Sequence, residues 1–90
     1  MEYKVIVETN RESHFIAGKI LKYHALVLEI VRRKGFPIEE FRRYLKDKGV
    51  ELTYQKLNNF LNGRFTDNDL CDHLIGYYHY IKEFGFYESK

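Results

Sequence analysis

The sequence predicts a mostly α-helical single domain, a bundle of four to five helices with a short β-strand at its N-terminus. Three observations predict this class. Apolar residues recur at helical spacing from residue 15 onward, glycines follow most of the expected helices, and a length of 90 residues suits one domain. The chain is 44% hydrophobic and 17% aromatic. This composition supplies a packed core and excludes a disordered protein.

The first element is a predicted strand. Residues 3–8, YKVIVE, are rich in β-branched residues and alternate, with Tyr3, Val5 and Val7 on one face. We therefore assign residues 1–14 to a strand or arm. A lone strand needs a partner. It either pairs with a second copy of the chain across a dimer axis or lies along the helices as an arm.

Residues 15–35 predict the first helix. Its inward residues recur at steps of three, four and seven, and they are Ile16, Ile20, Val27 and Val31. Apolar neighbours widen this face, so we expect the helix to be central. Gly35 is a natural stop after the helix, and Pro37 suits the opening of the next one.

Residues 37–64 predict two short helices with a tight break between them, a helix-turn-helix. Each helix has an inward apolar stripe, formed by Ile38, Phe41 and Leu45 in the first and by Leu57, Phe60 and Leu61 in the second. Gly49 ends the first helix and Thr53 is placed to cap the second. A last helix follows over residues 66–86. There Thr66 and Asp69 form a possible capping box.

The charges are segregated along the chain. Residues 32–64 hold nine basic residues against four acidic ones, a net charge of +5, whereas residues 65–90 have a net charge of −3. A basic excess in one region is the electrostatic pattern that a nucleic-acid-binding protein needs. The alternative is a basic surface that is only solvated.

Residues 57–64, LNNFLNGR, close the helix-turn-helix. This stretch resembles the end of the recognition helix in lambda-repressor-like (Cro/C1-type) DNA-binding domains. The matching residues are Leu57, Phe60, Leu61, Asn62, Gly63 and Arg64. The resemblance covers roughly residues 36–82. Two features depart from it, because the segment KDKGVELT is longer than the family's usual turn and an N-terminal strand is not part of that fold.

The resemblance implies a site on the second helix of the pair. Its base-contacting residues would be Thr53, Gln55, Lys56 and Asn59. Its phosphate-contacting residues would be Arg32, Arg33, Arg42, Arg43, Lys46, Asn62 and Arg64. No acidic residue lies between Thr53 and Arg64. A helix that faces duplex DNA requires this, because a carboxylate there would be repelled by the phosphates.

These residues predict a small sequence-specific DNA-binding protein, a transcriptional regulator of bacterial, phage or plasmid type. The alternative is a non-enzymatic protein-interaction module, such as a phage-type inhibitor or adaptor, on the same scaffold. The C-terminal aromatic residues predict a homodimer surface, and they are Tyr80, Phe84, Phe86 and Tyr87. In the other arrangement the strand region covers these rings and the protein is a monomer.

Other functions have little support in the sequence. It has no nucleophile elbow, P-loop, Cys-x-x-Cys or His-x-x-x-His motif, so we expect no enzyme, metal or cofactor. No apolar run is long enough to span a membrane. The N-terminus lacks the features of a signal peptide, and the single cysteine, Cys71, suits a reducing compartment. We therefore expect a cytoplasmic protein.

Overall fold

The chain folds into four helices in the computed structural model, which describes residues 2–32 and 35–85, with side chains from residue 14 onward. They are α1 (Glu2–Val31), α2 (Ile38–Asp47), α3 (Tyr54–Leu61) and α4 (Asn68–Phe84). The mostly helical class predicted from the sequence is confirmed. Within the described residues no strand is present.

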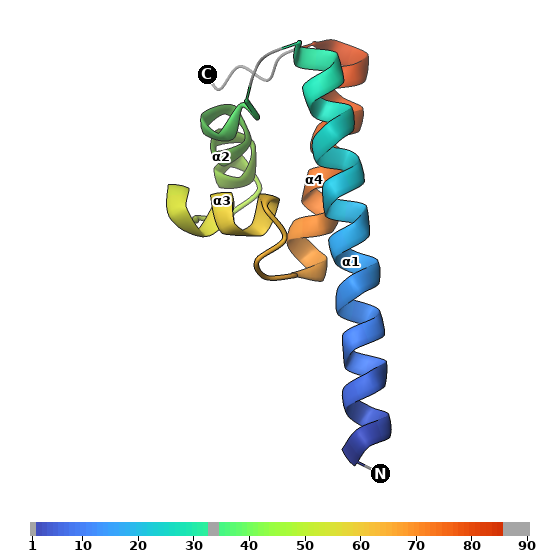
Figure 1. Cartoon of the computed structure of the whole chain (residues 1–90). Coiled ribbons are helices and arrows are strands. Elements are labelled where there is room, and N and C mark those ends of the chain that lie inside the picture. The colour runs from blue at the N-terminus through green and yellow to red at the C-terminus, as the bar shows by residue number, and fades with distance from the viewer. Residues whose placement is uncertain (1, 33–34, 86–90) are drawn as a thin grey trace.

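Two long helices form the body of the molecule. Figure 1 shows α4 beside α1, with the C-terminal ends of both helices at the same end of the molecule, and the short helices α2 and α3 on one side of them. The N-terminal part of α1 extends beyond the other helices. The molecule is accordingly elongated, with extents of 50 × 25 × 21 Å.

The N-terminal strand predicted over residues 3–8 is not supported, because these residues lie within α1. An alternating pattern over only six residues cannot by itself distinguish a strand from part of a helix. A strand without a partner strand would also leave its backbone N–H and C=O groups without ladder hydrogen bonds. As part of α1, the same backbone is bonded within the helix. The proposed strand pairing across a dimer axis and the covering arm lose their basis.

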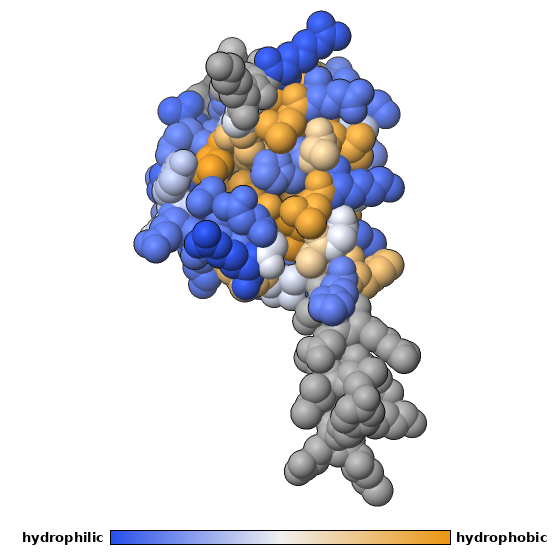
Figure 2. All heavy atoms as spheres, viewed as in Figure 1, coloured by the Kyte–Doolittle hydropathy of each residue, from blue (hydrophilic) through white to orange (hydrophobic). Residues whose placement is uncertain are grey.

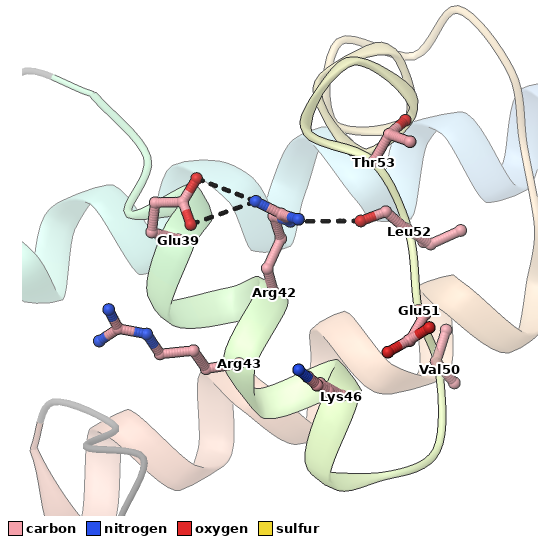
Figure 3. A pocket seen from close by; sticks show the side chains of 8 residues that line it. All are labelled: Glu39, Arg42, Arg43, Lys46, Val50, Glu51, Leu52 and Thr53. Carbon is pink, nitrogen blue, oxygen red and sulfur yellow. Dashed lines mark hydrogen bonds and ion pairs between the residues drawn. The ribbon is translucent and has the colours of Figure 1, made fainter.

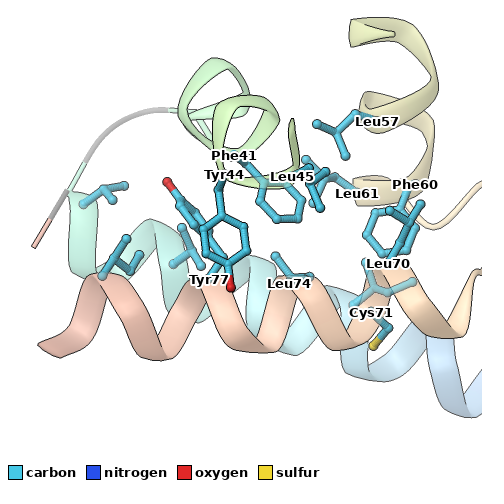
Figure 4. Packing of buried hydrophobic residues seen from close by; sticks show 14 residues of the cluster. Phe41, Tyr44, Leu45, Leu57, Phe60, Leu61, Leu70, Cys71, Leu74 and Tyr77 are labelled. Atoms are coloured by element: carbon cyan, nitrogen blue, oxygen red, sulfur yellow. The ribbon is translucent and has the colours of Figure 1, made fainter. Parts of the chain in front are cut away.

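The core lies between α4 and the inward faces of the other three helices. As the stripes predicted, Phe41 and Leu45 of α2 and Leu57, Phe60 and Leu61 of α3 are buried, and Figure 4 shows them above α4. Tyr77 of α4 is fully buried at the centre. Its ring centroid lies 5.0 Å from that of Phe41 and 5.4 Å from that of Tyr44. Helix α2 therefore takes its position from aromatic packing on α4, whereas α3 packs against α1 and α2.

The helix ends follow local backbone chemistry, with two corrections to the prediction. Helix α1 ends at Val31 and not at Gly35, and the residue after it, Arg32, has a left-handed φ of 52°. Helix α4 is capped by Asp67, whose carboxylate accepts a hydrogen bond from the Leu70 N–H at 2.9 Å, so the Thr66 capping box is wrong by one residue. As predicted, Gly49 follows α2, and its φ of 85° favours glycine.

Gly76 allows α4 to approach α2 closely. A Cβ atom at this position would lie 2.9 Å from the Tyr44 hydroxyl oxygen, and the Tyr44 ring is buried. We expect Gly76→Ala to lower the free energy of unfolding by about 1 kcal/mol through this clash. In a Tyr44→Phe background the clash is absent, so the same change should stabilise the protein by roughly 0.5–1 kcal/mol, as alanine does in a helix. Urea unfolding of the four proteins measures the difference. If Gly76→Ala changed the free energy of unfolding equally in the wild type and in Tyr44→Phe, a clash with the Tyr44 hydroxyl would be ruled out.

Cys71 should make stability depend on pH. The thiol is buried, and this burial, aided by the nearby Asp72 charge and opposed by Lys19, raises its pKa above the ordinary value of 9.0. Because the folded-state pKa is the higher one, the contribution to stability is complete below 9.0 and is lost as the pH rises through the folded-state value. We expect the free energy of unfolding to fall more steeply above this pH in the wild type than in Cys71→Ala. Parallel pH dependences in urea unfolding would refute this.

Candidate nucleic-acid interface

Arg42 fixes the geometry of the α2–α3 pair. Its Nε donates a hydrogen bond to the Leu52 carbonyl oxygen at 3.2 Å, and its Nη1 donates to Glu39 Oε1 at 3.2 Å. Figure 3 shows Arg42 reaching from α2 to the connecting segment, residues 48–53, just before Thr53. A side chain held in this way positions the start of α3. The structure thus places Arg42, predicted to contact phosphate, in a structural role within the site.

A groove of about 560 Å³ lies between α2 and the connecting segment. It is lined by Glu39, Arg42, Arg43, Lys46, Val50, Glu51, Leu52 and Thr53, and Figure 3 shows these side chains. Arg43 and Lys46 are exposed, one helical turn apart on α2. Four predicted site residues, Arg42, Arg43, Lys46 and Thr53, are therefore brought to one groove. The adjacent Glu51 carboxylate partly offsets their positive charge.

Three of the four predicted base-contacting residues, Thr53, Gln55 and Lys56, lie at the N-terminal end of α3. The Thr53 hydroxyl oxygen caps the helix by accepting a hydrogen bond from the Lys56 N–H at 3.1 Å. Gln55 and Lys56 are exposed in the first turn, and the Tyr54 side chain beside them is 53% exposed. The buried stripe of α3 lies opposite. Figure 2 shows hydrophilic side chains over the α2–α3 side of the molecule.

The other end of α3 is more constrained. Asn59 is half-buried, and its Oδ1 accepts a hydrogen bond from Arg64 Nη1 at 3.1 Å. Arg64 and Asn62 are exposed. These three predicted residues therefore lie together at the C-terminal end of the helix. The Asn59–Arg64 pair directs the guanidinium back along α3.

His24 of α1 contacts the site region and was not among the predicted site residues. Its Nδ1 lies 3.2 Å from the Leu61 carbonyl oxygen at the end of α3, and its ring packs edge-on against Phe36 at 4.9 Å. The only feature of the sequence that could have indicated this contact is the position of a histidine on the inward stripe of α1. The contact ties the last turn of α3 to α1.

An acidic groove borders α3 on another side. It has a volume of about 500 Å³ and is lined by Val50, Leu52, Lys56, Asp67, Asp69, Leu70, Asp72 and His73. Lys56 therefore lines the same groove as three carboxylates, those of Asp67, Asp69 and Asp72. Among the residues that the structure describes, no group of three or more His, Cys, Asp or Glu side chains is arranged to hold a metal ion. Because these carboxylates would repel an anion, a surface that binds an anion cannot extend into the acidic groove.

The remaining predicted residues lie elsewhere. Arg32 is exposed at the end of α1 and lines a different groove, with Ile30 and Lys82. Tyr80 is half-buried, with its ring 6.3 Å from that of Tyr44. The Phe84 ring lies 5.1 Å from Tyr80 and is 67% exposed. The other three, Arg33, Phe86 and Tyr87, lie outside the described residues.

No protein-family model, curated protein or solved structure matches this chain. The fold and the grooves therefore define only a class, a small mostly helical domain with a closely packed pair of short helices. None of the helices that the structure describes is both long enough and apolar enough to cross a membrane.

Proposed function

We propose that this chain is a small sequence-specific DNA-binding protein, a transcriptional regulator that inserts α3 into the major groove. The observation that carries the proposal is the outer face of α3. It exposes Gln55 and Lys56, has no carboxylate, and begins at a groove edged by Arg43 and Lys46. In this proposal α2 and α3 act as a helix-turn-helix.

The dimensions and side chains of α3 suit this role. Eight residues make a helix about 12 Å long, and a helix with its side chains is about as wide as the major groove of B-DNA. The amide of Gln55 can bond adenine in a bidentate manner, and the Lys56 ammonium can reach guanine. Thr53 keeps its hydroxyl hydrogen for a phosphate or base oxygen, because its oxygen already accepts the capping bond.

Phosphate contacts would come from both ends of α3. Arg43 and Lys46 lie beside its start, and Arg64 lies at its end. Neutralising phosphates on both sides of a groove positions a protein without reading sequence. The acidic groove around Asp69 limits the contact on its own side, so the duplex lies toward α2. Arg42 contributes by holding the connecting segment.

Selection from a library of randomised DNA duplexes tests sequence-specific binding. We expect the wild-type protein to enrich a short motif and Gln55→Ala to relax the preference at one position of it, because each bidentate pair contributes roughly 1–3 kcal/mol of discrimination. Lys22→Ala, a change on the exposed face of α1, is the control and should leave the motif unchanged. Failure of the wild type to enrich any motif would reject sequence-specific recognition.

The exposed ring of Phe84 favours a second candidate, a non-enzymatic protein-interaction module of the inhibitor or adaptor type. A side chain that is 67% exposed beside the Tyr80 ring offers an aromatic anchor for a protein partner. Substitutions distinguish the two candidate functions. Loss of biological activity in Phe84→Ala, with Gln55→Ala and Lys56→Ala fully active, would favour the second.

A further inference from the structure

The outer side of the α1–α4 pair has a groove that neither α2 nor α3 lines. Its volume is about 410 Å³, and its lining residues are Leu26, Glu29, Ile30, Arg32, Tyr78 and Lys82. Leu26, Ile30 and Tyr78 supply an apolar floor, and the other three supply charges of both signs. A mixed apolar and charged groove of this kind resembles a protein interface more than a small-molecule pocket.

The apolar floor continues along α1. Phe15, Lys19, Tyr23, Leu26 and Ile30 recur at steps of three and four, which places them on one side of the helix. The Phe15 side chain is 65% exposed, and the Lys19 Nζ lies 4.7 Å from the centre of its ring. Tyr23 contacts the α4 residue Tyr78, with ring centroids 5.4 Å apart. These residues and the facing α4 side chains form what we call the α1–α4 strip.

Two pairs of opposite charges lie on the α1–α4 strip, at two different heights along the helices. In each pair one charge belongs to α1 and the other to α4. Near the C-terminal ends, Glu29 of α1 and Lys82 of α4 line the same groove. Further down, Tyr23 lies against Tyr78 and the two helices run in the same direction. Asp72, six residues before Tyr78, therefore lies near the level of Lys19, four residues before Tyr23. Along α1 the order is positive then negative, and along α4 it is negative then positive.

We propose that the α1–α4 strip is the docking surface for a second copy of this chain, related by a two-fold axis along the strip. Because this axis runs parallel to the helices, α1 of one copy packs against α4 of the other. Residues at the same height along the strip then face each other across the interface. Glu29 then faces Lys82 of the second copy, and Lys19 faces Asp72. Arg32, just beyond Glu29, meets the negative end of the α4 dipole of the second copy. Every charge named here finds an opposite charge.

The size of the strip predicts the strength of this dimer. From Phe15 to Ile30 the strip is about 22 Å long, and two helices make it about 20 Å wide. This area is at the low end for specific interfaces, so we expect reversible association with a micromolar Kd, roughly 1–100 µM. The interface leaves α3 exposed. It does not depend on DNA binding and stands whether or not the proposed function is correct.

Sedimentation equilibrium without DNA, from low micromolar to several hundred micromolar protein, tests the proposal. We expect the wild type to dimerise and Lys82→Glu to raise the dimer Kd by at least roughly tenfold, because the introduced carboxylate would face Glu29 of the second copy. The exchange variant Glu29→Lys/Lys82→Glu restores opposite charges and should recover the affinity. Circular dichroism melts identify any variant that fails to fold, and Ile30→Ser then replaces Lys82→Glu as the disrupting change.

Two results would overturn the proposal. One is a wild type that stays monomeric over the whole concentration range. The other is a dimer that is unaffected by Lys82→Glu and is lost in Phe84→Ser, which would place the interface at the C-terminal aromatic residues. Both results are independent of any DNA measurement.

Discussion

Replacing Phe41 with alanine should lower the free energy of unfolding by about 3–5 kcal/mol, the range for a fully buried phenylalanine. The Phe41 side chain has no exposed surface, and its ring lies 5.0 Å from that of Tyr77 and 5.7 Å from that of Phe36. Removing the ring leaves a cavity where α2 contacts α4. Urea unfolding followed by circular dichroism measures the loss.

Phe84→Ala is the matched control for this change. The same atoms are removed from a side chain that is 67% exposed, so we expect a change within about 0.5 kcal/mol. Equal losses in the two variants would mean that Phe41 is not the packing centre of α2. A small loss in Phe41→Ala alone would show that the site collapses around the missing ring.

Lys56→Glu should weaken binding to duplex DNA by roughly tenfold to a hundredfold, because it removes one cation and places a carboxylate next to the phosphates. Lys56 is exposed in the first turn of α3, and only its backbone N–H takes part in the Thr53 cap. The change should therefore leave the fold intact. Fluorescence anisotropy with labelled duplex at constant salt measures the affinity.

Lys22→Glu makes the same change of charge on α1. Because Lys22 is exposed on a helix outside the α2–α3 pair, we expect at most about a twofold effect on DNA affinity. If both variants weaken binding equally, attraction depends on overall charge and α3 has no special role. If neither weakens it, α3 does not contact the duplex.

The sequence was most informative where apolar spacing was regular. The predicted stripe of α3 is buried in full, because apolar residues on the one buried face of a helix recur every three or four positions. In α2 the prediction was correct for Phe41 and Leu45, but Ile38 is only half-buried and the buried Tyr44 was not predicted. The N-terminal strand was wrong because a six-residue alternation contains too little information to exclude a helix. The end of α1 was also wrong, since the chain turns at Arg32 through a left-handed conformation that arginine seldom adopts.

The candidate site was predictable only in part, for a physical reason. Helical spacing identifies which residues face outward, so Gln55 and Lys56 could be named in advance. It cannot identify which cations bond to the protein itself. Arg42 is engaged with Leu52 and Glu39 because the connecting segment folds back onto α2. Contacts between distant parts of the chain, such as His24 with Leu61, depend on the tertiary fold and have no local pattern.

Binding of the wild-type protein to random-sequence duplex DNA over a salt series is the most direct test of a DNA-contacting α3. With Arg43, Lys46 and Arg64 on phosphates, the logarithm of the binding constant should fall with the logarithm of the salt concentration at a slope of about −2 to −3. A slope in this range would match the number of phosphate contacts that the proposed surface provides. Absence of binding even at low salt would contradict DNA binding by α3.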